Sequence, residues 1–100
     1  MRVIALKHIR DFCLAHPAAA QALRAWTQEA HTASWKTPQD IRNRYASASF
    51  LKGNRVVFNI KGNDCRLVVA VAYRFEAVYI KFIGTHAQYD AIDAQTVEME

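Results

Sequence analysis

The sequence lacks any apolar run that approaches the roughly 20 residues of a membrane-spanning helix, so we expect no membrane association. Its first residues are interrupted by Lys7, His8 and Arg10, which argues against a secretory signal. There are only two cysteines, Cys13 and Cys65, and they lie far apart without the spacing of a metal site. The simplest interpretation is a cytoplasmic protein with two reduced thiols.

Metal-ligand clusters are missing elsewhere too. The N-terminal histidines show no ligand spacing with any Cys, Asp or Glu, and we expect them at the surface: His8, His16 and His31. A metalloenzyme is therefore disfavoured, and we expect no metal and no cofactor. The chain also has no internal repeat, low-complexity tract or linker, so its 100 residues predict a single domain over 1–100 with one core.

The chain carries more positive than negative charge. A formal charge of +4 and a pI near 9.3 favour a polyanionic partner, although a slightly basic surface explains the same numbers. Most Lys and Arg residues lie between Lys36 and Lys81, whereas the segment after residue 90 carries Asp93, Glu98 and Glu100. The basic charge therefore lies in the half of the chain that holds the strongest strand signals.

Residues 55–90 carry the strongest strand signals in the sequence. Runs of Val, Ile, Phe and Tyr bounded by Gly, Asn and Asp predict three short strands joined by two hairpin turns. Gly62-Asn63 suits a two-residue type II′ turn, because glycine tolerates the positive φ of its first position. The second turn is predicted at 74–77, with Tyr73 paired to Val78.

These turns assign the side chains to two faces. A turn that closes between residues 61 and 64 sets Asn59 opposite Arg66. The first face is then apolar and should form the core: Val56, Phe58, Ile60, Cys65, Leu67, Val69, Val71, Ile80 and Phe82. The second face gathers the basic groups and should hold the functional site: Arg55, Asn59, Lys61, Arg66, Tyr79, Lys81, Ile83 and Thr85.

The N-terminal part should supply the cover for the apolar face. Residues 1–5 predict an edge strand, and apolar residues at helical spacing predict a helix over 6–15. Pro17 ends that helix and opens the next, which runs to about residue 33 and buries Trp26. The result is a helical hairpin packed on the sheet.

Between this hairpin and the strands we expect one more short helix. Thr37 as N-cap, Pro38 at the first position and Asp40 in the first turn predict a helix that ends near residue 44. Residues 46–49 read as a loop, and Gly53-Asn54 as a turn before the first main strand. The predicted class is therefore α+β.

The motifs in residues 35–90 resemble the HigB family of bacterial toxins. The residues that carry the resemblance are Trp35, Thr37-Pro38, Asp40-Ile41, Ser49-Phe50, Phe58–Asn63, Arg66–Val68, Tyr79–Lys81, Gly84–His86 and Tyr89-Asp90. The resemblance implies a RelE-like fold: a small, twisted, mostly antiparallel sheet packed on an N-terminal helical hairpin. Fold alone does not license a function, because function depends on the site.

The family also implies an activity and partners. HigB proteins are messenger-RNA interferases that generally cut messenger RNA in the ribosomal A site, so messenger RNA and the ribosome are the expected partners. Each is neutralised by an antitoxin, HigA, which usually carries a helix-turn-helix domain. The toxin would then meet DNA only indirectly, through the antitoxin that represses the operon.

Metal-independent RNA cleavage uses the substrate's own 2′-hydroxyl as nucleophile, and the protein must supply a base, an acid and fixed cations. Arg66 is the candidate phosphate clamp, because its planar fork matches two phosphate oxygens and stays charged. The matching arginine of RelE-type toxins has this role. The alternative is an ordinary surface arginine on a solvated sheet face.

Three further residues are candidates for the chemistry. His86 can donate or accept a proton near neutral pH, although it could instead be a surface residue at the start of a short helix. In the RelE superfamily, which the resemblance to HigB proteins implies, the comparable position is often another basic residue. Lys61 could stabilise negative charge or simply pair with Asp64, and Tyr89 could stack on a base or pack on the sheet. Asp90 could orient His86 or cap a turn.

The expected RNA contacts lie around these groups: Asn59, Lys81, Arg55 and Lys52. Two functions from different classes fit the sequence. The first is the toxin, an endoribonuclease that inhibits translation, and the second is a non-catalytic RNA-binding or regulatory domain on the same scaffold. The sequence does not separate them fully, because RelE-like folds that lack their acid–base residues also exist.

Overall fold

The computed structural model describes residues 1–61 and 64–99. Its elements follow in the order β1 (Arg2–Ile4), α1 (Leu6–Ala15), α2 (Pro17–Thr32), α3 (Pro38–Arg44), β2 (Ser49–Leu51), β3 (Arg55–Ile60), β4 (Cys65–Ala72), a 3₁₀ turn η1 (Tyr73–Phe75), β5 (Ala77–Thr85) and α4 (His86–Asp90). The two predicted N-terminal helices, the short third helix and the edge strand are all confirmed, with ends that agree to within about a residue.

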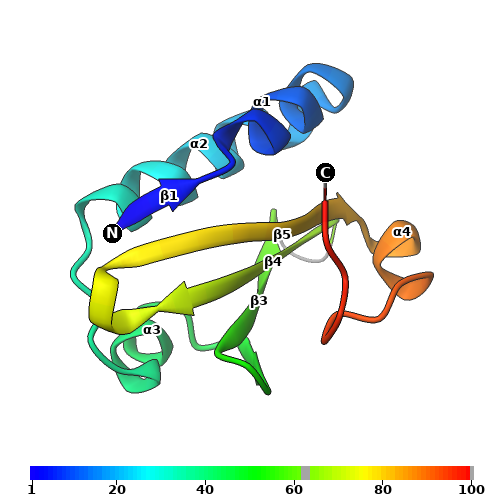
Figure 1. The fold of residues 1–100 in the computed structure, drawn as a ribbon. Coiled ribbons are helices and arrows are strands. Elements are labelled where there is room, and N and C mark those ends of the chain that lie inside the picture. Colours follow the sequence, from blue (N-terminus) through cyan, green and yellow to red (C-terminus); the bar gives the residue numbers. More distant parts are fainter. Residues whose placement is uncertain (62–63, 100) are drawn as a thin grey trace.

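The strands form one mixed sheet with the order β1-β5-β4-β3-β2. β1 pairs in parallel with β5, and the other neighbours are antiparallel. Helices α1 and α2 lie side by side across one face of the sheet, while α4 and the C-terminal segment lie at the end where β5 finishes (Figure 1). The predicted α+β fold, with a helical hairpin on a mostly antiparallel sheet, is therefore confirmed.

Local sequence explains where the helices begin. Pro17 is the first residue of α2, where its missing N–H leaves no hydrogen bond unmade. At α3, Thr37 and Asp40 form a capping box: the Thr37 hydroxyl accepts from the Asp40 N–H at 3.4 Å, and the Asp40 carboxylate accepts from the Thr37 N–H at 3.1 Å. Both features were readable from the sequence.

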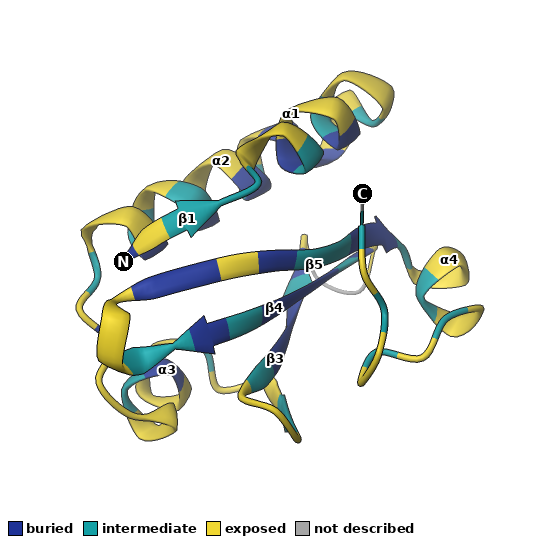
Figure 2. Cartoon of the chain, viewed as in Figure 1, coloured by how far each residue is buried: buried dark blue, intermediate teal, exposed yellow. Residues whose placement is uncertain are grey.

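The core lies between the helical hairpin and the sheet, and the sides of α1 and α2 that face the strands are the buried ones (Figure 2). Phe58 is central to it, with only 1% of its surface exposed. Its ring centroid lies 5.3 Å from that of Trp26, 6.3 Å from Trp35 and 5.1 Å from Tyr45. Three separate parts of the chain therefore meet on one strand residue, and the predicted burial of Trp26 is confirmed.

The first hairpin has the predicted register, with Asn59 opposite Arg66. The predicted type II′ turn at Gly62-Asn63 lies outside the described residues. The second hairpin differs from the prediction, because Val78 pairs with Val71 and not with Tyr73. The reversal uses a full 3₁₀ turn and a left-handed Glu76 with φ of 51°, which sequence patterns do not reveal. Since the shift is two residues, the faces do not change at this end.

A β-bulge does change the faces further along β5. Ile80 pairs with Val69 but Phe82 pairs with Val68, so Lys81 is an extra residue on that strand. Beyond the bulge, the faces predicted for Phe82, Ile83 and Thr85 are therefore wrong. Phe82 lies on the face of Arg66, while Ile83 is buried in the core at 4% exposure and Thr85 pairs with Cys65.

One strand was not expected. Residues 49–51 form β2, with Phe50 opposite Val56, where Ser49 had been assigned to a loop. Three residues are too few to show a period of two. The predicted turn that follows is confirmed, because Gly53 and Asn54 have φ of 72° and 59°. Within the described ranges, no helix is both long and apolar enough to cross a bilayer.

Candidate active site

Arg66 lies near the start of β4, the central strand of the sheet, on the face opposite the helical hairpin. Its strand neighbours are Asn59 on β3 and Gly84 on β5. The guanidinium Nη1 donates to the Cys65 carbonyl at 3.4 Å, and its Cζ lies 5.8 Å from the centre of the Tyr89 ring. A cation–π contact at this distance holds the planar group near the aromatic ring. Arg66 and Tyr89, predicted separately, therefore lie together.

Tyr89 and His86 both come from α4, which follows β5 without an intervening loop. Thr85 starts this helix with a capping box to Gln88, so the helix direction is fixed at its first turn. The His86 N–H donates to the Asp64 carbonyl at 3.1 Å, which ties α4 to the start of β4. The helix is therefore anchored to the same end of the sheet as Arg66.

The His86 imidazole is oriented by its own helix. Its Nδ1 lies 3.0 Å from the Asp90 Oδ2, and half of the side chain is exposed. A carboxylate on Nδ1 fixes the tautomer and leaves Nε2 directed elsewhere for proton transfer. The orienting role considered for Asp90 has a geometric basis, and so has the alternative of a histidine at the start of a short helix.

Lys61 lies where β3 ends, with a left-handed φ of 52°. Its Nζ is 3.8 Å from the Asp64 carboxylate, the pairing that the sequence offered as the alternative to a catalytic role. Asp64 therefore joins two of the candidates, since its side chain faces Lys61 and its carbonyl accepts from His86. Both members of the ion pair are substantially exposed, so the pair contributes little stability and is easily exchanged.

The other predicted RNA contacts divide into separate places. Asn59 donates to the Ser47 carbonyl at 3.5 Å and lines a hollow of about 230 Å³ between α2 and the end of β3. Lys52 is exposed in the turn between β2 and β3, at the opposite end of β3 from Lys61. The structure does not bring Lys52 together with Arg66.

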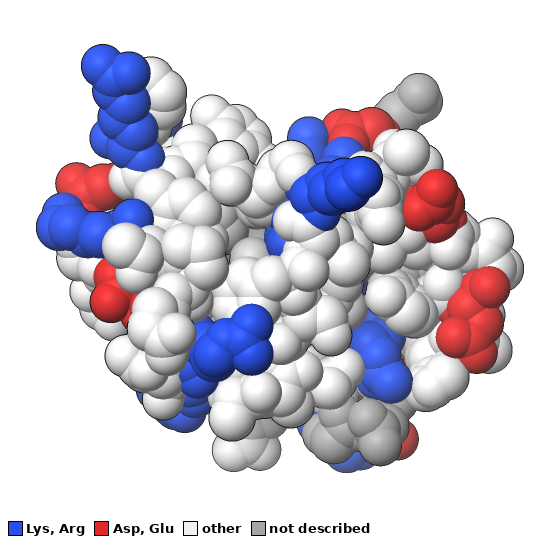
Figure 3. Space-filling view, turned by 90° about the horizontal axis from the view of Figure 1, so that it is seen from below, with Lys and Arg blue, Asp and Glu red and all other residues white. Residues whose placement is uncertain are grey.

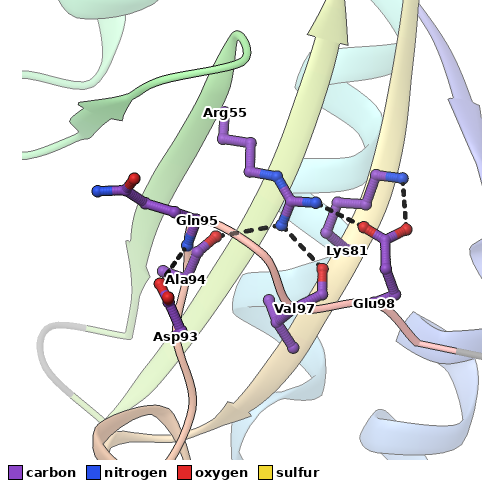
Figure 4. Close-up of polar contacts among 7 residues, drawn as sticks. All are labelled: Arg55, Lys81, Asp93, Ala94, Gln95, Val97 and Glu98. Atoms are coloured by element: carbon purple, nitrogen blue, oxygen red, sulfur yellow. Dashed lines mark hydrogen bonds and ion pairs between the residues drawn. The ribbon is translucent and has the colours of Figure 1, made fainter.

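Arg55 and Lys81 form a second cluster that sequence reasoning did not assemble. Arg55 donates to the carbonyls of Ala94 and Val97 at 3.1 and 2.8 Å, and its Nη2 is 2.5 Å from a Glu98 carboxylate oxygen. Lys81 donates to the other Glu98 oxygen at 2.8 Å (Figure 4). The hydrogen bond from Lys81, then that from Arg55, hold the pKa of Glu98 below its ordinary value. Sequence offered only one signal for this contact, the acidic character of the C-terminal segment.

The charge on this side of the molecule is dispersed. In the view of Figure 3, Lys and Arg side chains lie at several separate places, and acidic side chains lie at both the left and the right edge. A hollow of about 530 Å³ lies elsewhere, between α1 and α2, and its lining includes Leu6, Ile9, Cys13 and Leu14 together with Arg10 and Arg24. None of the predicted site residues lines this hollow.

Gly84 limits what can be changed near the site. A Cβ on this residue would lie 2.5 Å from the Phe82 ring and 2.9 Å from the Gln88 side-chain oxygen that caps α4. We expect Gly84→Ala to lower the free energy of unfolding by about 1–3 kcal/mol, as overpacking does. Urea denaturation measures this loss, and adding Phe82→Leu should recover part of it by removing the ring atom in conflict. Equal stabilities for wild type and Gly84→Ala would contradict the predicted close contact.

Comparisons with a family model and with individual proteins identify the same family. Residues 19–92 match the model of the HigB toxin family, described as the RelE-like toxic component of a toxin–antitoxin system. The chain is 27% identical over 96 residues to the mRNA interferase toxin HigB of Escherichia coli (strain K12), covering 94% of this chain and 92% of that protein. The mRNA interferase HigB of Shigella flexneri matches to the same extent. Since the family model spans most of the chain, this protein belongs to the HigB toxin family, the RelE-like toxic components of toxin–antitoxin systems.

Proposed function

We propose that this chain acts as one RelE-like domain that cleaves messenger RNA, as an mRNA interferase. The observation that supports this most is the position of Arg66 beside Tyr89, next to a helix that also carries the His86–Asp90 pair. A clamp for phosphate, an aromatic surface for a base and an oriented imidazole are the groups that such cleavage needs. The relatives named as mRNA interferases support the same activity.

In the proposed mechanism the substrate's 2′-hydroxyl loses its proton to a base and attacks the adjacent phosphorus, and no metal takes part. The bond from phosphorus to the 5′-oxygen of the next nucleotide breaks, and that oxygen leaves with a proton from an acid, which gives a 2′,3′-cyclic phosphate and a 5′-hydroxyl. Arg66 binds the non-bridging oxygens and stabilises the added negative charge of the pentavalent transition state. His86 moves a proton through Nε2, while Asp90 holds Nδ1. Lys61 supplies further positive charge or a second proton-transfer group, and Tyr89 stacks on a base beside the scissile bond. Measuring the cleavage rate against pH for variants that each lack one of these groups would assign the acid and the base.

The RNA backbone would extend from this site across the same sheet face. Asn59 is the nearest of the proposed contacts, because it is the strand partner of Arg66. Lys81 lies at the bulge beside Val68 and Val69, Arg55 pairs with Ala70 further along β4, and Lys52 lies in the turn before β3, so these residues would meet other phosphates. These contacts hold the strand by charge and carry no base sequence, since phosphates are alike.

We further propose that cleavage takes place on the ribosome, in the A site, in the cytoplasm. The partner that restrains it would be a HigA-type antitoxin with a helix-turn-helix domain. A toxin–antitoxin family implies such a partner, and a gene for a helix-turn-helix protein beside this one would identify it.

Induced expression tests the proposed function directly. We expect growth arrest within minutes and new 5′ ends inside coding regions, mapped by primer extension after a short pulse. Co-expression of the neighbouring antitoxin should restore growth and intact transcripts. Unchanged growth and intact messages, with RNA binding retained by the purified protein, would favour the non-catalytic RNA-binding domain.

A further inference from the structure

The C-terminal segment Asp93–Met99 lies across the face of the sheet that carries the candidate site (Figures 1 and 4). Arg55 fixes its backbone through two carbonyls, so the path of the segment does not depend on Glu98. Val57 and Val68, which point to this face and not to the hairpin, are 3% and 0% exposed. The hydrogen bonds from Arg55 therefore hold the backbone of this segment in place.

The Glu98 carboxylate is held differently from the backbone around it. Each of its two oxygens faces one cation, Arg55 at one and Lys81 at the other. The two cationic side chains are 11% and 24% exposed, whereas the Glu98 side chain is 55% exposed. The cations are thus positioned by the sheet, and the anion between them is the exposed and exchangeable member.

This pair of cations suits a phosphodiester as well as a carboxylate. Both anions present two charged oxygens on one centre, and charge-assisted bonds from Arg and Lys to either are short and strong. Arg55 and Asn59 lie four residues apart on the same face of β3, roughly 13 Å at the rise of a strand. Because Asn59 is the strand partner of Arg66, an RNA bound at Arg66 can extend to Arg55 and Lys81.

We propose that Arg55 and Lys81 form a second phosphate-binding site for RNA, and that Glu98 occupies it as an internal competitor until RNA arrives. The inference rests on the proposed function, because the competing ligand is the RNA backbone. Only the Glu98 side chain has to turn away, since Arg55 keeps its hold on the carbonyls of Ala94 and Val97. Each binding event must break two ion pairs, so RNA binds more weakly than the cations alone would allow.

The test compares two variants that lose the same charge. Glu98→Gln frees the two cations, whereas Asp11→Asn removes an exposed carboxylate on α1. Binding is measured by fluorescence anisotropy with a short 2′-O-methyl RNA, which lacks the attacking hydroxyl. We expect Glu98→Gln to bind about 3- to 10-fold more tightly, the range for releasing two partly exposed ion pairs. Asp11→Asn should change the affinity less than about 1.5-fold at physiological salt, where distant charges are screened.

Two further measurements connect the gain to this site. Glu98→Gln should steepen the slope of log K against log salt by about 0.7 for each cation that becomes available to phosphate. Adding Lys81→Gln should return the affinity of the Glu98→Gln protein to the wild-type value or below. Thermal unfolding midpoints of all variants establish that they are folded before affinities are compared.

The outcomes separate this inference from the proposed function. If wild type binds and cleaves RNA but Glu98→Gln binds no better than Asp11→Asn, the competition by Glu98 is wrong and the nuclease proposal stands. A Glu98→Gln gain that survives Lys81→Gln would also overturn the second site. If neither wild type nor any variant binds RNA, the proposed function fails and the inference fails with it.

Discussion

Replacing Arg66 with alanine should lower the rate of messenger-RNA cleavage by about 100- to 1,000-fold, the loss typical of removing one donor that stabilises transition-state charge. Arg66 is the cation at the centre of the candidate site, and its guanidinium lies next to Tyr89. Alanine leaves no group that can reach the phosphate oxygens. Induced expression of Arg66→Ala should therefore permit growth, and primer extension should find intact transcripts.

The control for this variant is Arg74→Ala, which removes an arginine of the second hairpin, at the far end of β4. It should leave cleavage and toxicity unchanged. Arg66→Lys tests the planar fork, since a lysine keeps the charge but binds one oxygen at a time. Arg66→Ala must also remain folded and bound by its antitoxin. Cleavage at the wild-type rate by a folded Arg66→Ala protein would remove Arg66 from the mechanism.

Phe58→Ala should lower the free energy of unfolding by about 3–5 kcal/mol, the usual cost of truncating a buried phenylalanine. The residue is 1% exposed and contacts rings from α2, from the segment before α3 and from its end. Its loss opens a cavity that these rings cannot all move to fill. Such a change is a large fraction of the 5–15 kcal/mol that a domain of this size has.

Phe75→Ala is the matched control, because Phe75 is 72% exposed on the second hairpin. We expect a change within about 0.5 kcal/mol for this surface position. Urea denaturation followed by tryptophan fluorescence and by circular dichroism measures both variants. A loss below 1 kcal/mol for Phe58→Ala, with an unchanged denaturant slope, would mean that the core can reorganise around the missing ring.

The parts of the fold that follow from short-range chemistry were predictable from the sequence. Pro17, the cap at Thr37 and the turn at Gly53-Asn54 act on their immediate neighbours, so the sequence near each one is sufficient. The first hairpin register followed from one turn and one apolar alternation. The bulge at Lys81 did not, because an extra strand residue depends on how β5 fits β4 over its whole length.

The candidate site was also predictable only in part. Arg66, Tyr89 and His86 were singled out from their types and from the family resemblance, and short elements explain their positions. Arg55 and Lys81 were predicted on one face as RNA contacts, but their contact with Glu98 was not, because Glu98 comes from a distant segment without a strong secondary-structure signal. Contacts of that kind depend on the tertiary path of the chain, which neither periodicity nor propensity reports.

The parallel pairing of β1 with β5 affects how the molecule can be assembled during synthesis. Arg2 is made before its partner Ala77, which lies far along the sequence. β1 must therefore wait for its partner until β5 has left the ribosome. Pairings of such long sequence separation are slow to form. A nascent chain cut short before the end of β5 would thus lack both a complete sheet and the helix that carries His86.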